Sequence, residues 1–248
     1  MKNPLGCWPK RWLPKPTPDT TQVQALSRAL GVSPVLATLL VQRSITDFDQ
    51  AKAYFRPSMN DLHDPFVMHG MDLAVRRLHQ AIAQQKPILV YGDYDVDGVT
   101  AVAMCYDFLQ RLGANVHFYI PDRYAEGYGI SMQAVTWAAT HNIDLMVSLD
   151  CGIKAIDCIA QAKGLGIDVI VCDHHEPGDT LPAAYAILDP KQPHCPYPTK
   201  ALSGCGVGFK LLQGYVQQQG LSTALLRPYL DLVAVSIACD IVPIVGEN

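Results

Sequence analysis

Short apolar runs alternate with helical segments through residues 72–189, and this alternation constrains the fold more than any other feature of the sequence. The apolar runs predict buried strands at 87–91, 115–120, 144–149 and 168–172, with a further candidate at 184–189. The helical segments lie at 72–85, 99–112, 131–141 and 154–164. Strands that alternate with helices are typical of a parallel sheet with helices on both faces. We therefore predict an α/β fold, closed by helices near 206–218 and 222–240.

The first 70 residues follow a different pattern. Five prolines among the first 19 residues predict an extended arm, which we expect Trp8 and Trp12 to pack against the rest of the protein. Three short helices should follow, near 20–30, 34–43 and 47–55. We therefore predict two parts, an arm with a small helical lead-in over residues 1–70 and the α/β domain over residues 71–248.

The composition limits the class of protein. A chain of 248 residues with 49% hydrophobic content can bury one large core. Its net charge of −4 argues against a surface coated with Lys and Arg, and so against nonspecific binding of duplex DNA. The eight cysteines form no C-x-x-C pair, so we expect reduced thiols rather than a zinc ribbon. Since we find no signal peptide and no apolar run of about 18 residues, we expect a cytoplasmic protein with no membrane partner.

Three carboxylates lie close together in the sequence Gly-Asp-Tyr-Asp-Val-Asp-Gly, directly after the strand that ends near residue 91. They are Asp93, Asp95 and Asp97. Open α/β sheets bind their ligands at the carboxyl ends of the strands, and like charges this close are unfavourable unless a cation holds them. A calcium loop of the EF-hand type begins in the same way, but the required later Glu is missing and a helix follows at once.

Other acids and histidines also follow predicted strands or end a helix. Asp150 comes after the strand at 144–149, where a helix cap is the alternative interpretation. The sequence Asp173-His174-His175 follows the next strand, and adjacent histidines point in different directions, so we expect only one to reach a given metal. Asp240 ends a helix that is otherwise apolar, where an unpartnered carboxylate would be costly to bury. We interpret the remaining isolated histidines as structural, among them His63, His79, His117 and His141.

These acids and histidines should meet in one crevice, because successive units of a parallel sheet deliver their strand ends to the same edge. Carboxylate oxygens with one or two imidazoles and no thiolate suit manganese or magnesium better than structural zinc. Four or more carboxylates are enough for two metals that share a bridging ligand. Two metals roughly 3.5–4 Å apart form the clamp used for in-line attack on phosphorus. The residues alone therefore predict a two-metal site for phosphate chemistry.

The same residues carry a resemblance to a known family. GDYDVDG, the strand end at Asp150, DHHEPG and the late Asp240 resemble, in order, the four signature motifs of the DHH phosphoesterases. Within that family, the stretches 40–72 and 120–129 resemble the RecJ-type exonucleases, and the match is to their N-terminal catalytic portion. The resemblance implies metal-dependent hydrolysis of single-stranded DNA, with 5′→3′ polarity, in DNA repair and recombination. It also implies two Mn2+ or Mg2+ ions, and a single-strand-binding protein and a helicase as candidate partners.

Carried over residue by residue, the resemblance assigns metal ligands. Asp95 would bind the first metal, while Asp97, His174 and Asp240 would bind the second. Asp150 would bridge the two.

Residues around the metals receive roles in the same way. Asp93 would be an extra ligand or would support one, and His175 would contact the scissile phosphate or transfer a proton. Asp173 would orient His174 or its loop. Arg123 would bind substrate phosphate, with a surface ion pair to Asp122 or Glu126 as the alternative. The glycine-rich turn at Ser203, Gly204 and Gly206 would also bind substrate phosphate. The alternative is a tight helix start that binds no ligand.

Two departures from the family pattern stand out. Tyr91 occupies a position where some relatives have His, and a tyrosine cannot replace that ligand at neutral pH, so we expect the first metal to bind less tightly here. The sequence ends at Asn248, before the second lobe and the OB-like module of the family, so we expect a chain that binds metal but cleaves DNA weakly. Two rival functions are a phosphodiesterase for short oligonucleotides or cyclic dinucleotides, and a non-catalytic replication-associated protein.

Overall fold

The computed structural model describes residues 11–248, which form two compact units. The division falls between Asp61 and Leu62, so residues 62–70 belong with the α/β unit and not with the lead-in. The short 3-10 helix η2 (Pro65–Val67) explains this, because it packs against a long helix of the α/β unit and buries Pro65 and Met68.

The N-terminal unit contains the three predicted helices, α1 (Thr20–Leu30), α2 (Pro34–Val41) and α3 (Phe48–Phe55). Side chains at their N-caps accept hydrogen bonds from the first turns, which is why the helices begin where they do. Their small core consists of Val23, Leu26, Ala37, Leu40, Ile45 and Ala51.

Residues 11–19, the described part of the predicted arm, contain no helix or strand. The expected packing of Trp12 is wrong, since that residue is 91% exposed, and Trp8 lies outside the described residues. Across residues 11–248, no single helix has the length and apolar character needed to cross a membrane, and α1 with α2 meets that test only as a pair bent by 115°.

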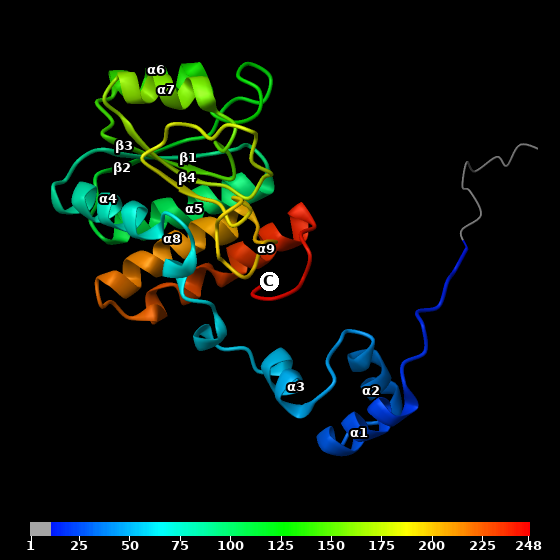
Figure 1. The fold of residues 1–248 in the computed structure, drawn as a ribbon. Coiled ribbons are helices and arrows are strands. Elements are labelled where there is room, and N and C mark those ends of the chain that lie inside the picture. Colours follow the sequence, from blue (N-terminus) through cyan, green and yellow to red (C-terminus); the bar gives the residue numbers. More distant parts are fainter. Residues whose placement is uncertain (1–10) are drawn as a thin grey trace, which may run out of the picture. The chain divides into compact units, whose positions relative to one another are not determined.

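The α/β unit is built on a five-stranded parallel sheet, as predicted (Figure 1). The strand order is β2-β1-β3-β4-β5. The strands are β1 (Ile88–Gly92), β2 (Val116–Tyr119), β3 (Leu145–Leu149), β4 (Asp168–Cys172) and β5 (Ala186–Leu188). The strands β1 and β3 are buried along their whole length, which explains their continuous apolar sequences.

Helices cover both faces of this sheet, which confirms the predicted fold class. They are α4 (Met71–Ala83), α5 (Val96–Arg111), α6 (Met132–Thr140), α7 (Ile156–Gly164), α8 (Gly204–Gln218) and α9 (Leu230–Asp240). Figure 1 shows α6 and α7 on one face, with α4, α5, α8 and α9 on the other.

Two helix starts differ from the predictions. The helix expected at 99 begins at Val96, capped by Asp95, and the one expected at 222 begins at Leu230, after the 3-10 helices η3 (Thr223–Leu225) and η4 (Arg227–Tyr229).

The amino-terminal edge of the sheet is held by a buried arginine. Arg77 from α4 binds Asp144, which precedes β3, at 2.5 Å and Asp168, which begins β4, at 2.6 Å. These ion pairs fix α4 to two central strands at the edge opposite the predicted site, so they support the fold without contributing to the chemistry.

Candidate metal centre

The sheet register brings three of the predicted carboxylates to one edge. Gly92 of β1 pairs with Leu149 of β3, and Leu149 pairs with Cys172 of β4. The next residue along each strand is an aspartate, and these residues are Asp93, Asp150 and Asp173. The parallel register therefore places three acids side by side, as the sequence predicts.

A first group of possible metal ligands consists of Asp93, Asp95 and Asp150, each offering an oxygen within 4.8 Å of the others. Both carboxylate oxygens of Asp93 are buried without a hydrogen-bond partner. Burial raises the pKa of Asp93, and burial together with the charges of Asp97 and Asp95 raises the pKa of Asp150 to about 10. Without a cation, this group of acids is therefore poorly suited to carry its full negative charge.

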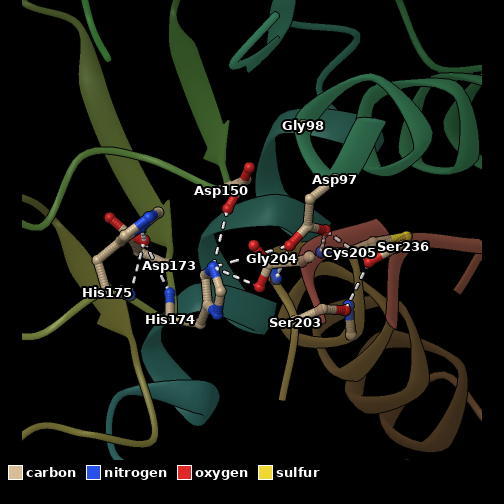
Figure 2. A network of polar contacts seen from close by, with 12 residues as sticks. Asp97, Gly98, Asp150, Asp173, His174, His175, Ser203, Gly204, Cys205 and Ser236 are labelled. Carbon is tan, nitrogen blue, oxygen red and sulfur yellow. Dashed lines mark hydrogen bonds and ion pairs between the residues drawn. The ribbon is translucent and has the colours of Figure 1, made fainter. Parts of the chain in front are cut away.

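A second group consists of Asp97, His174 and Asp240. The His174 Nε2 atom lies 3.7 Å from Asp97 Oδ2 and 3.1 Å from Asp150 Oδ1 (Figure 2). It also lies 3.7 Å from Asp240 Oδ2. Asp240 is the last residue of α9, and its carboxylate is one-third exposed, so it lines the open side of the group. A third group joins Asp150 and His174 to His175. Asp150 thus belongs to the first and third groups and lies 3.1 Å from His174 of the second, which is the position expected of a bridging ligand.

The side chains fit a pair of hard divalent cations. His174 Nε2 and Asp150 Oδ1 are both buried and face each other at 3.1 Å, yet neither has a hydrogen-bond partner among residues 11–248. Unpartnered buried polar atoms are rare, and here they converge on a common space. The donors are carboxylate oxygens and one imidazole nitrogen, the set that manganese and magnesium prefer.

Asp150 has an unusual backbone conformation that aims its side chain into this space. Its φ of 60° lies in the left-handed region, which costs free energy for a residue other than glycine. The alternative interpretation of Asp150 as a helix cap is wrong, because α7 begins only at Ile156 and its N-cap is Ala155.

Asp97 is held by the start of α8. Its carboxylate accepts hydrogen bonds from the backbone N–H groups of Gly204 at 2.7 Å and Cys205 at 2.6 Å, and from the Ser236 hydroxyl at 2.6 Å. Ser203 caps α8 by accepting from the Gly206 N–H group. The helix N-terminus thus binds a carboxylate of the protein itself.

This arrangement bears on the predicted phosphate site at the glycine-rich turn. Ser203, Gly204 and Gly206 are all buried, and both glycines donate their N–H groups within the protein. Gly204 is also required sterically, because a Cβ atom there would lie 2.5 Å from the Asp150 Cβ and Oδ1 atoms. In the structure these residues position Asp97 and Asp150.

Asp173 organises the loop after β4. Its carboxylate accepts from the backbone N–H groups of Ile153, His174 and His175, and from the His175 Nδ1 atom at 2.7 Å. Burial opposes the negative charge on Asp173, but these hydrogen bonds outweigh it and lower its pKa, while the hydrogen bond to Asp173 raises the pKa of His175. The ring that Asp173 orients is that of His175, whereas His174 receives only a backbone contact (Figure 2).

Two further predicted residues lie near the centre. Tyr91 is buried and donates its hydroxyl to the Gly129 carbonyl at 2.6 Å, so it supports the loop that contains Gly129. The Arg123 guanidinium lies over the Tyr94 ring, 5.1 Å from its centroid. The alternative ion pair of Arg123 is absent among the described residues, and Glu126 instead accepts hydrogen bonds from Tyr119 and Asp122.

Three residues of the centre were not among those predicted. Tyr128 contacts His175, with 3.0 Å between its hydroxyl and Nε2. The Ser236 hydroxyl donates a hydrogen bond to Asp97. In the sequence, the feature that could have identified Ser236 was a single hydroxyl residue in an otherwise apolar helix. Asp189 follows the short strand β5, where one of its oxygens is buried without a partner and burial raises its pKa to about 7. The position of Asp189 at a strand end was the signal that could have identified it.

Comparisons with known proteins agree with this fold and identify the family. The family model described as "DHH family, N-terminal domain" matches residues 87–237, and the chain therefore belongs to the DHH family. The chain is similar to the single-stranded-DNA-specific exonuclease RecJ of Bacillus subtilis (strain 168), with 43% identity over 231 residues, covering 93% of this chain and 29% of the relative. It is 34% identical over 241 residues to RecJ of Thermus thermophilus, covering 96% of this chain and 34% of that relative.

Solved structures give the same result. The crystal structure of RecJ from Thermus thermophilus in complex with Mn2+ matches with a TM-score of 0.76 and 32% identity, covering 93% of this chain and 32% of that one. The crystal structure of exonuclease RecJ bound to manganese matches with a TM-score of 0.66 and 37% identity, covering 72% of this chain and 45% of that one. The chain spans 29–40% of the length of the RecJ relatives that it matches at 34–43% identity.

Proposed function

We propose that this chain carries the catalytic centre of a single-stranded-DNA-specific exonuclease that hydrolyses phosphodiester bonds with 5′→3′ polarity, in DNA repair and recombination. The observation that carries the proposal is the convergence of two ligand groups at Asp150, which belongs to the first group and lies 3.1 Å from His174 of the second. Among the described residues, these two facing atoms, Asp150 Oδ1 and His174 Nε2, are buried without a hydrogen-bond partner. The likeness to RecJ proteins supports the substrate, since those relatives are named for single-stranded DNA.

The two ligand groups define where two Mn2+ or Mg2+ ions would bind. Asp95, with Asp93, would hold the first, and Asp97, His174 and Asp240 the second, with Asp150 between them. Bound there, the ions would supply Lewis acidity and positive charge for a phosphodiester. The RecJ structures bound to manganese support this choice of metal.

The protein's own side chains have separate tasks in this proposal. His175 lies beside the ligands with its ring aligned by Asp173, and it is partly exposed, so it can meet a phosphate oxygen or move a proton. Arg123 is exposed and free of ion pairs among the described residues, so its guanidinium can bind a phosphate of the strand.

Hydrolysis of labelled DNA tests the proposal. With Mn2+, the chain should release nucleotides from the 5′ end of a single strand at a low rate, which should still exceed its rate on a blunt duplex of the same sequence. Asp150→Ala should abolish this activity. Equal rates on single strand and duplex, or activity retained by Asp150→Ala, would contradict the proposal. A faster reaction on dinucleotides than on long strands would instead favour the short-oligonucleotide phosphodiesterase.

We propose a cytoplasmic location and single-stranded DNA as the macromolecular partner, with a single-strand-binding protein and a helicase as candidates to supply it. The seven free cysteines among residues 11–248 support a reducing compartment. A gel-filtration experiment with a single-strand-binding protein, with and without DNA, tests the first of these candidates.

A further inference from the structure

Tyr128 ends a chain of contacts that runs through His175. The His175 Nδ1 atom lies 2.7 Å from Asp173 Oδ1, and the Nε2 atom on the other side of the ring lies 3.0 Å from the Tyr128 hydroxyl. The same hydroxyl lies 3.4 Å from the backbone oxygen of Asp150. Both ring nitrogens of His175 therefore have a partner within the protein.

The chemistry of the two partners fixes the roles of the nitrogens. A carboxylate can only accept, so Asp173 requires a proton on Nδ1 of His175. In the neutral ring, Nε2 then has a lone pair and needs a donor. The Tyr128 hydroxyl has one proton, and Nε2 at 3.0 Å is a nearer acceptor for it than the Asp150 carbonyl at 3.4 Å, so the hydroxyl is placed to be that donor. Tyr128 thus favours the same tautomer as Asp173, from the opposite side of the ring.

Tyr128 has two aromatic neighbours, although it is 57% exposed. Its ring makes edge-to-face contacts with His175, at 5.9 Å between centroids, and with Tyr94 in the loop between Asp93 and Asp95, at 6.3 Å. The neighbouring Glu126 accepts hydrogen bonds from Tyr119, Ser131 and the Asp122 N–H group, which ties the preceding part of the loop to the sheet and to α6. The hydroxyl is therefore held by its ring and by its loop.

Tyr128 and His175 also line one cavity beside the metal centre. This cavity has a volume of about 240 Å3, and its lining also includes Ile130, Ile153, Lys154 and Asp173. A group that meets the exposed edge of His175 would enter from this side.

We propose that Tyr128 is a positioning residue, whose hydroxyl holds the His175 ring in one tautomer and one orientation at the wall of this cavity. The inference rests on the proposed hydrolysis at the metal centre and assigns it one more residue. The hydrogen-bond partners of the Tyr128 hydroxyl are the His175 ring and the backbone oxygen of Asp150, so its effect should pass through His175 and not through metal affinity.

Nitrogen NMR of the chain labelled with 15N-histidine tests the contact directly, without metal or activity. The His175 resonances are assigned by their loss in His175→Gln. In Tyr128→Phe, which keeps the ring and removes the hydroxyl, the Nε2 resonance should move downfield because its lone pair loses a donor. Tyr124→Phe is the matched control, since Tyr124 lies in the same loop and is 96% exposed. An Nε2 resonance that is unchanged in Tyr128→Phe would overturn the proposal.

Kinetics and metal binding separate positioning from a structural role. Tyr128→Phe should lower kcat on single-stranded DNA by roughly tenfold to hundredfold and leave KM within about twofold, because misalignment of a reacting group affects the chemical step. Manganese affinity should equal that of the parent, and a loss of manganese affinity in Tyr128→Phe would overturn the proposal. If the parent itself fails to hydrolyse DNA, the proposed function fails, while the NMR result still decides the role of Tyr128.

Discussion

Gly204→Ala should damage the metal centre without replacing any of the proposed ligands. The new Cβ atom would lie 2.5 Å from the Asp150 Cβ atom and 2.7 Å from its Cα atom, whereas carbon atoms pack at about 3.5–4.0 Å. One of the two backbones must therefore move by about 1 Å. Asp150 is buried and already has a φ of 60°, and Gly204 also holds Asp97 through its N–H group, so either movement displaces a proposed ligand.

The expected cost is an overpacking penalty of about 1–3 kcal/mol in the free energy of unfolding. Manganese affinity should fall by at least about tenfold, or about 1.4 kcal/mol. Urea unfolding of the metal-free chain measures the first effect, and calorimetric titration measures the second. Gly164→Ala is the matched control, because an added Cβ at that helical glycine meets nothing within 4 Å and should be neutral or stabilising by up to about 1 kcal/mol. The reasoning is refuted if both variants unfold alike and bind manganese alike.

Three further variants probe the neighbouring interactions. In the metal-free chain, Asp150 takes up a proton on folding because its pKa is raised to about 10, so its contribution to stability is present near pH 4 and lost as the pH rises towards 10. Asp150→Asn should therefore unfold at higher urea than the metal-free parent at pH 8, with a smaller difference at pH 5, and an equal midpoint at pH 8 would count against this. Ser236→Ala should cost about 1–3 kcal/mol and weaken manganese binding, since it removes a buried donor to Asp97; unchanged affinity would argue against that support. Arg77→Ala should cost about 2–5 kcal/mol in urea unfolding while the folded chain keeps its manganese affinity, and a cost below about 1 kcal/mol would contradict the role of its ion pairs.

The sequence was sufficient for the fold and for the meeting of the acids. Apolar runs that alternate with helices predict a parallel sheet, and such a sheet brings Asp93, Asp150 and Asp173 to one edge whatever the details of packing. The four motifs could be matched to the DHH family because each stands directly after a strand or at the end of a helix, and they occur in the family's order along the chain. These predictions depend on local pattern and on topology, which the sequence expresses directly.

The sequence pattern did not predict the contacts between segments that are distant along the chain. Ser236 reaches Asp97 across 139 residues, and Gly204 reaches it across 107. No periodicity shows that the glycine-rich turn would bind the protein's own carboxylate, because this depends on how α8 and α9 pack against α5. The contact of Tyr128 with His175 likewise depends on the path of the loop after β2. Contacts of this kind between side chains depend on tertiary packing, and the pattern of a single sequence does not show how its elements pack.

Manganese titration calorimetry of this chain beside Asp150→Ala tests the central claim most directly. The account predicts about two manganese ions per chain, with one or both lost in the variant, because Asp150 adjoins both ligand groups. Equal binding by the parent and the variant would contradict a shared centre, and so would the absence of binding by the parent at millimolar manganese.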